Sequence, residues 1–396
     1  MKITLVSHMF PTPRNSVSGI FVLQQAKALS ERGHDITVVS PVPYVPRVVS
    51  KLLDRRPSNE LPRTDSYDDI TVHYPRYWSL PRSETLPLVA YSFRRTLRQH
   101  RELFESADLI NAHVALPDGF GSIPLARSLD IPLVTTVHGA DVYQSAANPI
   151  AKAQIQSVFE RSNTVIMNSH RLLSEAKEAF GDLKGTPVVY NGIDTKQITG
   201  IASESLANVF PEDRMIVATI GTLIPRKGHK DVLRALETFS DETRPHYLVI
   251  GDGTLREGLE RYVADAGLDE HVHFTGYVPE HDRVFAKLKS ADIMAMPSSD
   301  EAFGIAYLEA MACGLPVIAC EGEGPADFIT HRETGFLVPP KDSDAIAEVL
   351  RELKENPELR RYVADRGQRT ALNGFSWERN AKAVEQVFDE AIETHR

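Results

Sequence analysis

The sequence predicts an α/β protein of two domains, each built on a largely parallel sheet with helices on both faces. Short apolar runs typical of buried strands alternate with longer amphipathic stretches typical of helices in both halves of the chain. The chain has 396 residues, which is enough for two domains of ordinary size. Hydrophobic residues make up 42% of the chain and charged residues 25%, so two full cores can be buried.

Charge and cysteine content narrow the class of protein further. A net charge of −10 and a pI near 5.8 argue against a general nucleic-acid binder, which would carry a basic excess. Cys313 lies at a predicted helix end and Cys320 at a predicted strand end. Two such cysteines are more often free buried thiols than a disulfide framework or a metal site. The first apolar run is too short for a signal sequence, and no run approaches the length of a membrane span. We expect a cytoplasmic protein, at most peripheral on the inner face of the cell membrane.

The first half of the chain predicts one parallel sheet. Its strands are expected at residues 3–6, 36–39, 108–112, 133–137, 165–167 and 188–190, with helices at 20–32 and 117–129. The loop 7–19 follows the first strand, at the sheet edge where α/β folds bind ligands. It contains no GxGxxG, so a nicotinamide fingerprint is not supported. Gly19, at the helix start, suits either close approach to a phosphate or sugar, or a simple turn.

Two histidines stand at predicted strand ends. His113 follows the strand at 108–112 and His138 follows the strand at 133–137. Both therefore belong on the ligand side of the sheet, where a histidine is a structural hydrogen bonder about as often as a functional group.

Two segments of the first half are locally basic. Residues 46–56 and 93–101 mix arginine and lysine with apolar residues at helical spacing. They could dock on an anionic membrane or a lipid-linked acceptor, but solvated helix faces over an apolar core are the favoured interpretation.

The second half repeats the strand–helix rhythm after a polar stretch, 196–212, that predicts a linker. Its strands are expected at residues 215–220, 247–250, 272–274, 292–296, 316–319 and 335–338. The loop after the first of these, GTLIPRKG at 221–228, is not a P-loop. Arg226 and Lys227 in this glycine-flanked loop nevertheless suit a diphosphate.

The most informative stretch is 296–320, which predicts strand end, loop, helix, turn and strand. Glu301 lies in the loop and Glu309 within the helix, which is expected to open at Phe303. The amides of Phe303, Gly304 and Ile305 would form an anion site there, and Gly304 would allow an oxygen close to the backbone. A carboxylate acceptor, a group of anion-binding amides and a second carboxylate acceptor, in this order, suit the sugar, diphosphate and ribose of a nucleotide-diphosphate sugar. An ordinary helix with two acids is the alternative.

One sequence looks like a metal motif. Asp342-Ser343-Asp344 has the DxD pattern, but it stands at a predicted helix start, where Asp is a common cap. We therefore predict no metal and no other cofactor.

The sequences of these segments resemble those of the retaining glycosyltransferases of family 4, which have the GT-B fold. The segments that carry the resemblance read PSSDEAFGIAYLEAMACGLPVIA, VTTVHGADV and SHMFPTPRNSVSGIFVLQQAKAL, and the last is closest to the branch with teichuronic-acid-type transferases. The resemblance implies two Rossmann-like α/β/α domains facing across a cleft. They are an acceptor-side domain at 1–195 and a nucleotide-sugar domain at 213–375, with a final helix at 376–396 that crosses back.

The resemblance also implies roles for individual residues. Catalytic roles fall to His138, Lys227 and Glu301. Donor binding falls to Gly19, Arg226, Gly251, Tyr277, Val278, Phe303, Gly304, Ile305 and Glu309. His113 takes a weaker, acceptor-side role. Thr222 stands where most members have Arg, which leaves one phosphate contact open, and Arg226 is a candidate to replace it.

The resemblance implies transfer of a sugar from an NDP-sugar, UDP-sugars being favoured over GDP-mannose, to a glycan or lipid-linked acceptor. Two alternatives remain. One is a GT-B nucleotide-sugar epimerase, and the other is an inactive module that only binds nucleotide-sugar, which Thr222 favours slightly.

Overall fold

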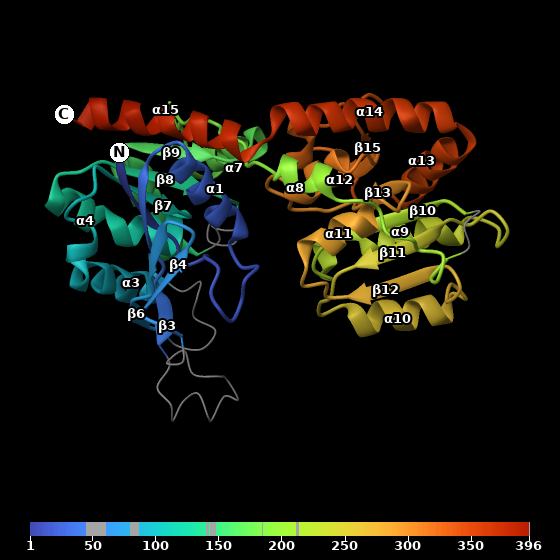
Figure 1. Cartoon of the computed structure of the whole chain (residues 1–396), viewed down its shortest axis with the longest axis horizontal. Helices are drawn as coiled ribbons and strands as arrows, with labels where there is room; N and C mark the ends of the chain where they lie inside the picture. Colours follow the sequence, from blue (N-terminus) through green and yellow to red (C-terminus); the bar gives the residue numbers. More distant parts are fainter. Residues whose placement is uncertain are drawn as a thin grey trace. The chain divides into compact units, whose positions relative to one another are not determined.

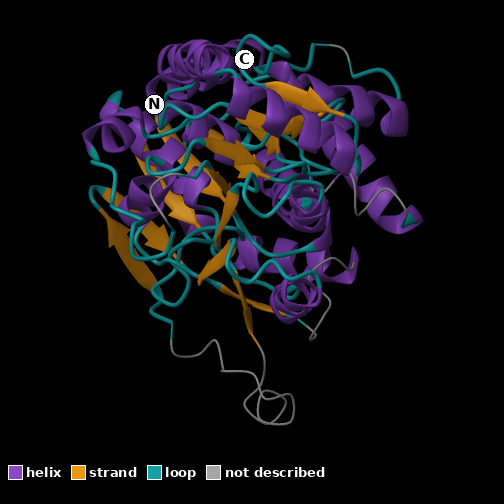
Figure 2. Cartoon of the chain, turned by 90° about the vertical axis from the view of Figure 1, so that its right-hand side faces the viewer, coloured by secondary structure: helices purple, strands orange, loops and turns teal. Residues whose placement is uncertain are grey.

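The computed structural model describes residues 1–44, 61–79, 87–139, 142, 148–183, 185–210 and 214–395. The basic segment 46–56 lies outside these ranges. The chain forms two compact units (Figure 1). Unit 1 comprises residues 1–192 and 377–396, and unit 2 comprises residues 193–376. In both units helices flank the strands (Figure 2). No helix in the described ranges is long and apolar enough to cross a membrane.

Unit 1 contains a seven-stranded sheet in the order β4-β5-β2-β1-β7-β8-β9. Its strands are β1 Lys2–Val6, β2 Asp35–Val39, β4 Thr64–Tyr67, β5 Ile70–His73, β7 Leu109–His113, β8 Leu133–Val137 and β9 Thr164–Met167. All neighbours pair in parallel except β4, which is antiparallel on β5 at the edge. β3 Val42–Tyr44 and β6 Arg76–Trp78 form a separate parallel pair.

One predicted strand of unit 1 is wrong. Residues 188–190 form only an isolated bridge, in which Val188 meets Met167 at the end of β9. Met167 is the last residue of β9, so the pairing goes no further. The chain continues to helix α8, Thr195–Gly200, which is capped by Asp194.

Alternate residues of the strands of unit 1 pack into two different hydrophobic cores, because successive side chains of a strand point to opposite faces of the sheet. Leu5 packs with helices α1 and α15, whereas Val6 packs with α3, α4, α6 and α7. The helices of unit 1 are α1 Ile20–Glu31, α3 Pro87–Gln99, α4 Phe120–Leu129, α6 Pro149–Arg161, α7 His170–Phe180 and α15 Trp377–His395, with short turns η2 Arg101–Leu103 and η3 Ala115–Gly119. The expected helix at 117–129 thus divides into η3 and α4.

Unit 2 contains a six-stranded, fully parallel sheet in the order β12-β11-β10-β13-β14-β15. Its strands are β10 Ile216–Ile220, β11 His246–Ile250, β12 Val272–Gly276, β13 Ile293–Ala295, β14 Val317–Cys320 and β15 Phe336–Val338. Its helices are α8 and α9 His229–Glu237, α10 Arg256–Asp265, α11 His281–Leu288, α12 Ile305–Ala312, α13 Ser343–Glu355 and α14 Pro357–Gly374, with short turns η4 Pro225–Lys227 and η5 Gly324–Asp327. The segment expected to be a linker contains part of α8 and packs within unit 2, where Glu204 pairs with Lys287.

Candidate functional site

The strand order of unit 2 reverses beside β10, which has β11 on one side and β13 on the other. Loops leaving the carboxyl ends of strands diverge at such a switch point and leave a crevice for ligands. The loop after β10 carries Arg226 and Lys227, and the loop after β13 carries Glu301. The topology therefore brings Arg226 and Lys227 together with Glu301, which lies 74 positions after Lys227 in the sequence.

Lys227 and Glu301 form the centre of this site. Lys227 Nζ donates to Glu301 Oε2 at 2.6 Å, and the two side chains are only 12% and 13% exposed. Arg226 Nη1 lies 3.7 Å from the same oxygen, and Ser298 Oγ donates to it at 3.1 Å. Burial alone would raise the pKa of the Glu301 carboxyl, but Lys227, Arg226 and Ser298 hold it below its ordinary value. Glu301 is therefore ionised at neutral pH and fixed in orientation.

The backbone of Glu301 is also held. Its N–H donates to Glu323 Oε2 at 2.7 Å, and its carbonyl accepts from Gly324 N–H at 2.8 Å. The preceding residue, Asp300, has a positive φ of 54°. Glu323 and Ser298 thus support the site, yet no local sequence pattern indicates either, because both contacts depend on the tertiary fold.

The helix after Glu301 begins two residues later than predicted. Gly304 is the N-cap of α12 at φ 89°, a left-handed conformation, and Ile305 is the first helical residue. A Cβ on Gly304 would lie 2.6 Å from Cδ2 of Tyr307, so glycine is required twice over. The Tyr307 amide donates to the Gly304 carbonyl at 3.1 Å, whereas the Ile305 and Ala306 amides have no acceptor within the helix and retain the character of an anion site. Phe303 precedes the left-handed Gly304 and is therefore not part of the helix; its ring is buried against Phe328 and Phe375, with ring centroids 5.4 Å and 6.4 Å away.

Glu309 has a different environment from Glu301. It lies on α12, partly buried, and no cation or hydrogen-bond donor among the described residues pairs with its carboxylate. Burial raises the pKa of this carboxyl to about 7. A carboxylate without a partner in this position is available to accept hydrogen bonds from a ligand.

The remaining predicted residues of unit 2 stand at the carboxyl ends of the next two strands. Gly251 follows β11 at φ 144°, and a Cβ there would lie 2.0 Å from the carbonyl oxygen of Gly221. Tyr277, 57% exposed, and Val278 follow β12. The predicted residues thus lie along one edge of the sheet, from β12 through β11 and β10 to β13.

In unit 1 the structure brings His113 and His138 together. His113 Nδ1 and His138 Nε2 are 3.1 Å apart, and the rings stack with an interplanar angle of 6°. Burial lowers the pKa of His138 to about 4 and, with the neighbouring His138, holds the pKa of His113 well below its ordinary value. Both rings are therefore neutral at pH 7. Phe21 packs on His138 with ring centroids 4.6 Å apart.

Of the two interpretations predicted for Gly19, the structure supports the turn glycine. It caps α1 at φ 66°, and a Cβ would lie 2.0 Å from the carbonyl oxygen of Met9. The close approach that glycine permits here is to the chain's own backbone, so the turn interpretation accounts for it.

Sequence reasoning missed a third histidine at this edge of unit 1. His8 follows β1, and its Nδ1 lies 2.9 Å from Oδ2 of Asp118, whose side chain is fully buried. The His8 backbone N–H donates to Asp118 Oδ1 at 3.1 Å. Asp118 lies four residues after Val114, whose φ of 76° is unusual for a β-branched residue. His8 carries the same signal as His113 and His138, a histidine just past a strand, and could have been found by it.

The DxD sequence is a helix cap, as predicted, because Asp342 Oδ1 accepts from the Ala345 amide at 2.9 Å. Across the described ranges, no three His, Cys, Asp or Glu side chains are grouped to hold a metal.

Comparison with known proteins matches nearly the whole chain to two family models. Glycosyltransferase Family 4 matches residues 18–197, and Glycosyl transferases group 1 matches residues 202–370. The teichuronic acid biosynthesis glycosyltransferase TuaC of Bacillus subtilis is 28% identical, over all of both chains. A GDP-mannose-dependent α-(1-6)-phosphatidylinositol monomannoside mannosyltransferase of Mycolicibacterium smegmatis is 27% identical, over 96% of this chain and 97% of its own.

Solved structures agree on the fold. Sucrose-phosphate synthase from Thermosynechococcus elongatus superposes with a TM-score of 0.81 at 21% identity, over all of both chains. Anabaena HepE in complex with UDP-glucose gives a TM-score of 0.71 at 19% identity, over 98% of this chain and 100% of that one. The resemblance seen in the sequence motifs is confirmed by the family models, and the predicted fold by these structures. The chain belongs to the family 4 glycosyltransferases and has their GT-B fold.

Proposed function

We propose that the protein is a retaining glycosyltransferase that moves a sugar from an NDP-sugar to a glycan or lipid-linked acceptor, in the synthesis of a cell-surface polysaccharide or glycolipid. The observation that carries this proposal is the buried Lys227–Glu301 pair, with Arg226 beside it, at the switch point of the unit 2 sheet. Anion-binding groups and an oriented carboxylate meet there, which is what a sugar diphosphate requires.

The diphosphate would be bound by Lys227, Arg226 and the first amides of α12. An ammonium has three donors, and Glu301 uses only one of those of Lys227, so the others remain for phosphate oxygens. The Arg226 side chain is 43% exposed, so its guanidinium group can reorient toward a phosphate. It is therefore a candidate to replace the phosphate contact of the Arg that most family members have at the position of Thr222. Together these groups would stabilise the leaving diphosphate, the task that a metal performs in other transferases.

The two acids would bind the two ends of the donor. Glu301, held next to the phosphate-binding groups, would accept from the sugar hydroxyls, and Glu309 would accept from the ribose. We infer same-face attack. The bond from the anomeric carbon to the diphosphate oxygen breaks, the acceptor oxygen bonds on the same face, and its proton passes to the departing phosphate. His138, neutral at pH 7, would contribute a hydrogen bond to the donor sugar, and His113 would hold its ring.

UDP-sugars remain the favoured donors in this proposal. Support comes from HepE, whose structures were solved with UDP and with UDP-glucose. The mannosyltransferase relative is named for GDP-mannose, so the base needs a direct test.

The test is a panel of UDP- and GDP-sugars, read by nucleotide release in EDTA, with and without a lipid extract. We expect UDP release with one donor, stimulated by the extract, and an anomeric configuration retained in the product. Three results would contradict the proposal: a rearranged sugar without an acceptor, nucleotide binding without turnover, or complete loss of activity in EDTA that Mg²⁺ or Mn²⁺ restores.

A further inference from the structure

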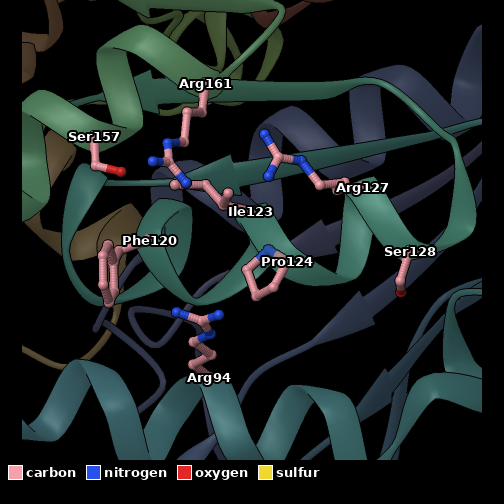
Figure 3. Close-up of a pocket in the computed structure, with 8 residues that line it drawn as sticks. All are labelled: Arg94, Phe120, Ile123, Pro124, Arg127, Ser128, Ser157 and Arg161. Atoms are coloured by element: carbon pink, nitrogen blue, oxygen red, sulfur yellow. The ribbon is translucent and has the colours of Figure 1, made fainter.

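Three arginines from three helices line one pocket on unit 1 (Figure 3). Arg94 comes from α3, Arg127 from α4 and Arg161 from α6. The pocket has a volume of about 300 Å³ and an apolar wall of Phe120, Ile123 and Pro124. Figure 3 shows this wall between Arg94 and the other two guanidinium groups. Below, these three arginines and this wall are called the arginine pocket.

The three side chains that define the arginine pocket all carry positive charge. Among the residues that the structure describes, no carboxylate forms an ion pair with Arg94, Arg127 or Arg161. Other arginines of unit 1 do form such pairs, for example Arg171 with Glu175 at 2.9 Å. The chain has 54 acidic against 44 basic residues, so an arginine cluster without an acid is a departure from its own composition. Like charges held in one pocket favour the binding of an anion.

The apolar wall makes this a stronger anion site than three arginines in open solvent. Phe120 and Ile123 are each only 8% exposed. The Arg94 guanidinium lies over the Phe120 ring, 6.0 Å from its centroid. A wall of low dielectric strengthens charge interactions at its surface, and the guanidinium fork matches the oxygens of a phosphate group.

Helix α3 continues the surface beyond the pocket. Leu88 and Tyr91 are 73% and 51% exposed, and Arg95 and Arg98 are exposed as well. Their spacing, three, seven and ten residues after Leu88, places all four on one face of the helix. Tyr91 also contacts the ring of Phe120, with centroids 5.4 Å apart, so this face adjoins the arginine pocket. Exposed apolar side chains beside a basic cluster are typical of helices that lie in a membrane interface.

We propose that the arginine pocket and this face of α3 bind the phosphate headgroups of anionic phospholipids and so dock the protein on a membrane surface. A soluble phosphate would need only the pocket. A bilayer also gives Leu88 and Tyr91 an apolar environment, which is why we assign the phosphate to lipid. The inference goes beyond the proposed transfer reaction, because it concerns residues of unit 1 that the proposed reaction does not use.

The test uses the full chain and two kinds of vesicle, pure phosphatidylcholine and phosphatidylcholine mixed with phosphatidylglycerol. We expect the wild type to sediment with the mixed vesicles and not with the pure ones. The variant R94Q/R127Q/R161Q should lose about 100-fold in vesicle affinity, from about fivefold for each basic residue near an anionic surface. The control R283Q/R361Q/R369Q removes the same charge from exposed sites on unit 2 and should retain wild-type binding.

A second variant tests the lipid source of the phosphate. L88S/Y91S keeps every arginine and should still weaken vesicle binding. If millimolar inorganic phosphate displaces the wild type from mixed vesicles while L88S/Y91S binds them normally, the pocket is a site for a soluble anion and the lipid proposal is wrong.

Other outcomes would also overturn the inference. These are equal binding to both vesicles, no binding to either, or equal losses in the pocket variant and the control. UDP affinity and the thermal midpoint, measured on every variant, show whether it is folded. If R94Q/R127Q/R161Q does not fold, Arg94, Arg127 and Arg161 changed to lysine replace it, with retained but weaker vesicle binding expected. A failed donor panel together with lipid binding would refute the proposed reaction alone.

Discussion

At the scale of single residues, Glu301 and Glu309 show how the surroundings of a glutamate determine its pKa and its hydrogen-bond partners. Glu301 has a cation at 2.6 Å and a pKa below its ordinary value, whereas Glu309 has no partner among the described residues and a raised pKa. The first is oriented before any ligand arrives. The second has unused hydrogen-bonding capacity.

These environments predict different kinetic effects. Glu301→Gln keeps the shape but removes the charge that stabilises the developing positive anomeric carbon, so kcat should fall about 10²-fold or more with nucleotide Kd nearly unchanged. Glu309→Gln should instead weaken nucleotide binding by about 1–3 kcal/mol, with a smaller effect on kcat. Nucleotide titration and initial rates on both variants measure the two quantities. A reversed pattern would mean that the ends of the donor are assigned the wrong way round.

The raised pKa of Glu309 predicts a pH-dependent stability. Between its ordinary value of 4.5 and about 7, the folded protein keeps a proton that the unfolded chain releases. Folding stability contributed by this group therefore falls as pH rises through that window, and above pH 7 the burial penalty is complete. Because glutamine does not ionise, the thermal midpoint of Glu309→Gln minus that of the wild type should be more positive at pH 8 than at pH 5. Equal differences at both pH values would show that Glu309 ionises normally.

Residue types at strand ends were predictable from sequence, but their partners were not. Arg226, Lys227 and Glu301 lie in polar loops after buried strands, a pattern visible in the sequence. Ser298 and Glu323, which complete the setting of Glu301, have no such pattern. Glu323 reaches Glu301 only because β14 runs beside β13.

At the scale of elements, the start of α12 is set by Gly304 rather than by hydrophobic periodicity. The spacing of apolar residues predicts a helix from Phe303, but the left-handed glycine delays it to Ile305 and leaves Phe303 in an aromatic cluster.

Gly304→Ala should therefore be destabilising and should weaken nucleotide binding. The left-handed conformation costs an alanine about 1–2 kcal/mol, and the contact with Tyr307 adds to this cost. Gly258→Ala in α10 is the matched control, since its Cβ meets nothing within 4 Å and alanine favours the helix by about 0.5–1 kcal/mol. Denaturant titration and UDP affinity measure both effects. Equal behaviour of the two variants would contradict the role given to Gly304.

The sequence analysis missed both β4 and β5, the last two strands at one end of the unit 1 sheet. β4 reads TDSY, which has no apolar periodicity, and it is held at the sheet edge by antiparallel pairing with β5. The opposite error occurred at 188–190, where an apolar run forms a bridge instead of a strand. Hydrophobic pattern detects buried strands, whereas edge pairing depends on neighbours distant in the sequence.

At the scale of the molecule, the C-terminal helix α15 belongs to unit 1. Its buried Asn380 accepts from Gln25 Nε2 at 2.8 Å and donates to the Tyr190 carbonyl at 2.7 Å. Glu385, on the same helix, pairs with Arg32 and His34. Distant parts of the sequence are thus joined by polar contacts that composition and periodicity do not reveal.

Asn380→Ala should destabilise unit 1 by about 1–3 kcal/mol, because it removes the buried hydrogen bonds from the Gln25 amide and to the Tyr190 carbonyl. The control is Lys382→Ala, an exposed change on the same helix. Both tryptophans, Trp78 and Trp377, belong to unit 1, so fluorescence in a urea titration reports on this unit. An unchanged midpoint for Asn380→Ala would show that α15 does not stabilise unit 1 through Asn380.

The central claim is that the donor diphosphate binds at the switch point of unit 2, between the loop after β10 and the start of α12. Hydrogen–deuterium exchange of the wild type with and without saturating UDP, in EDTA, tests it most directly. The account predicts slowed exchange in peptides covering 221–228 and 296–312. UDP binding that leaves both peptides unchanged, or that slows exchange in unit 1 alone, would contradict it.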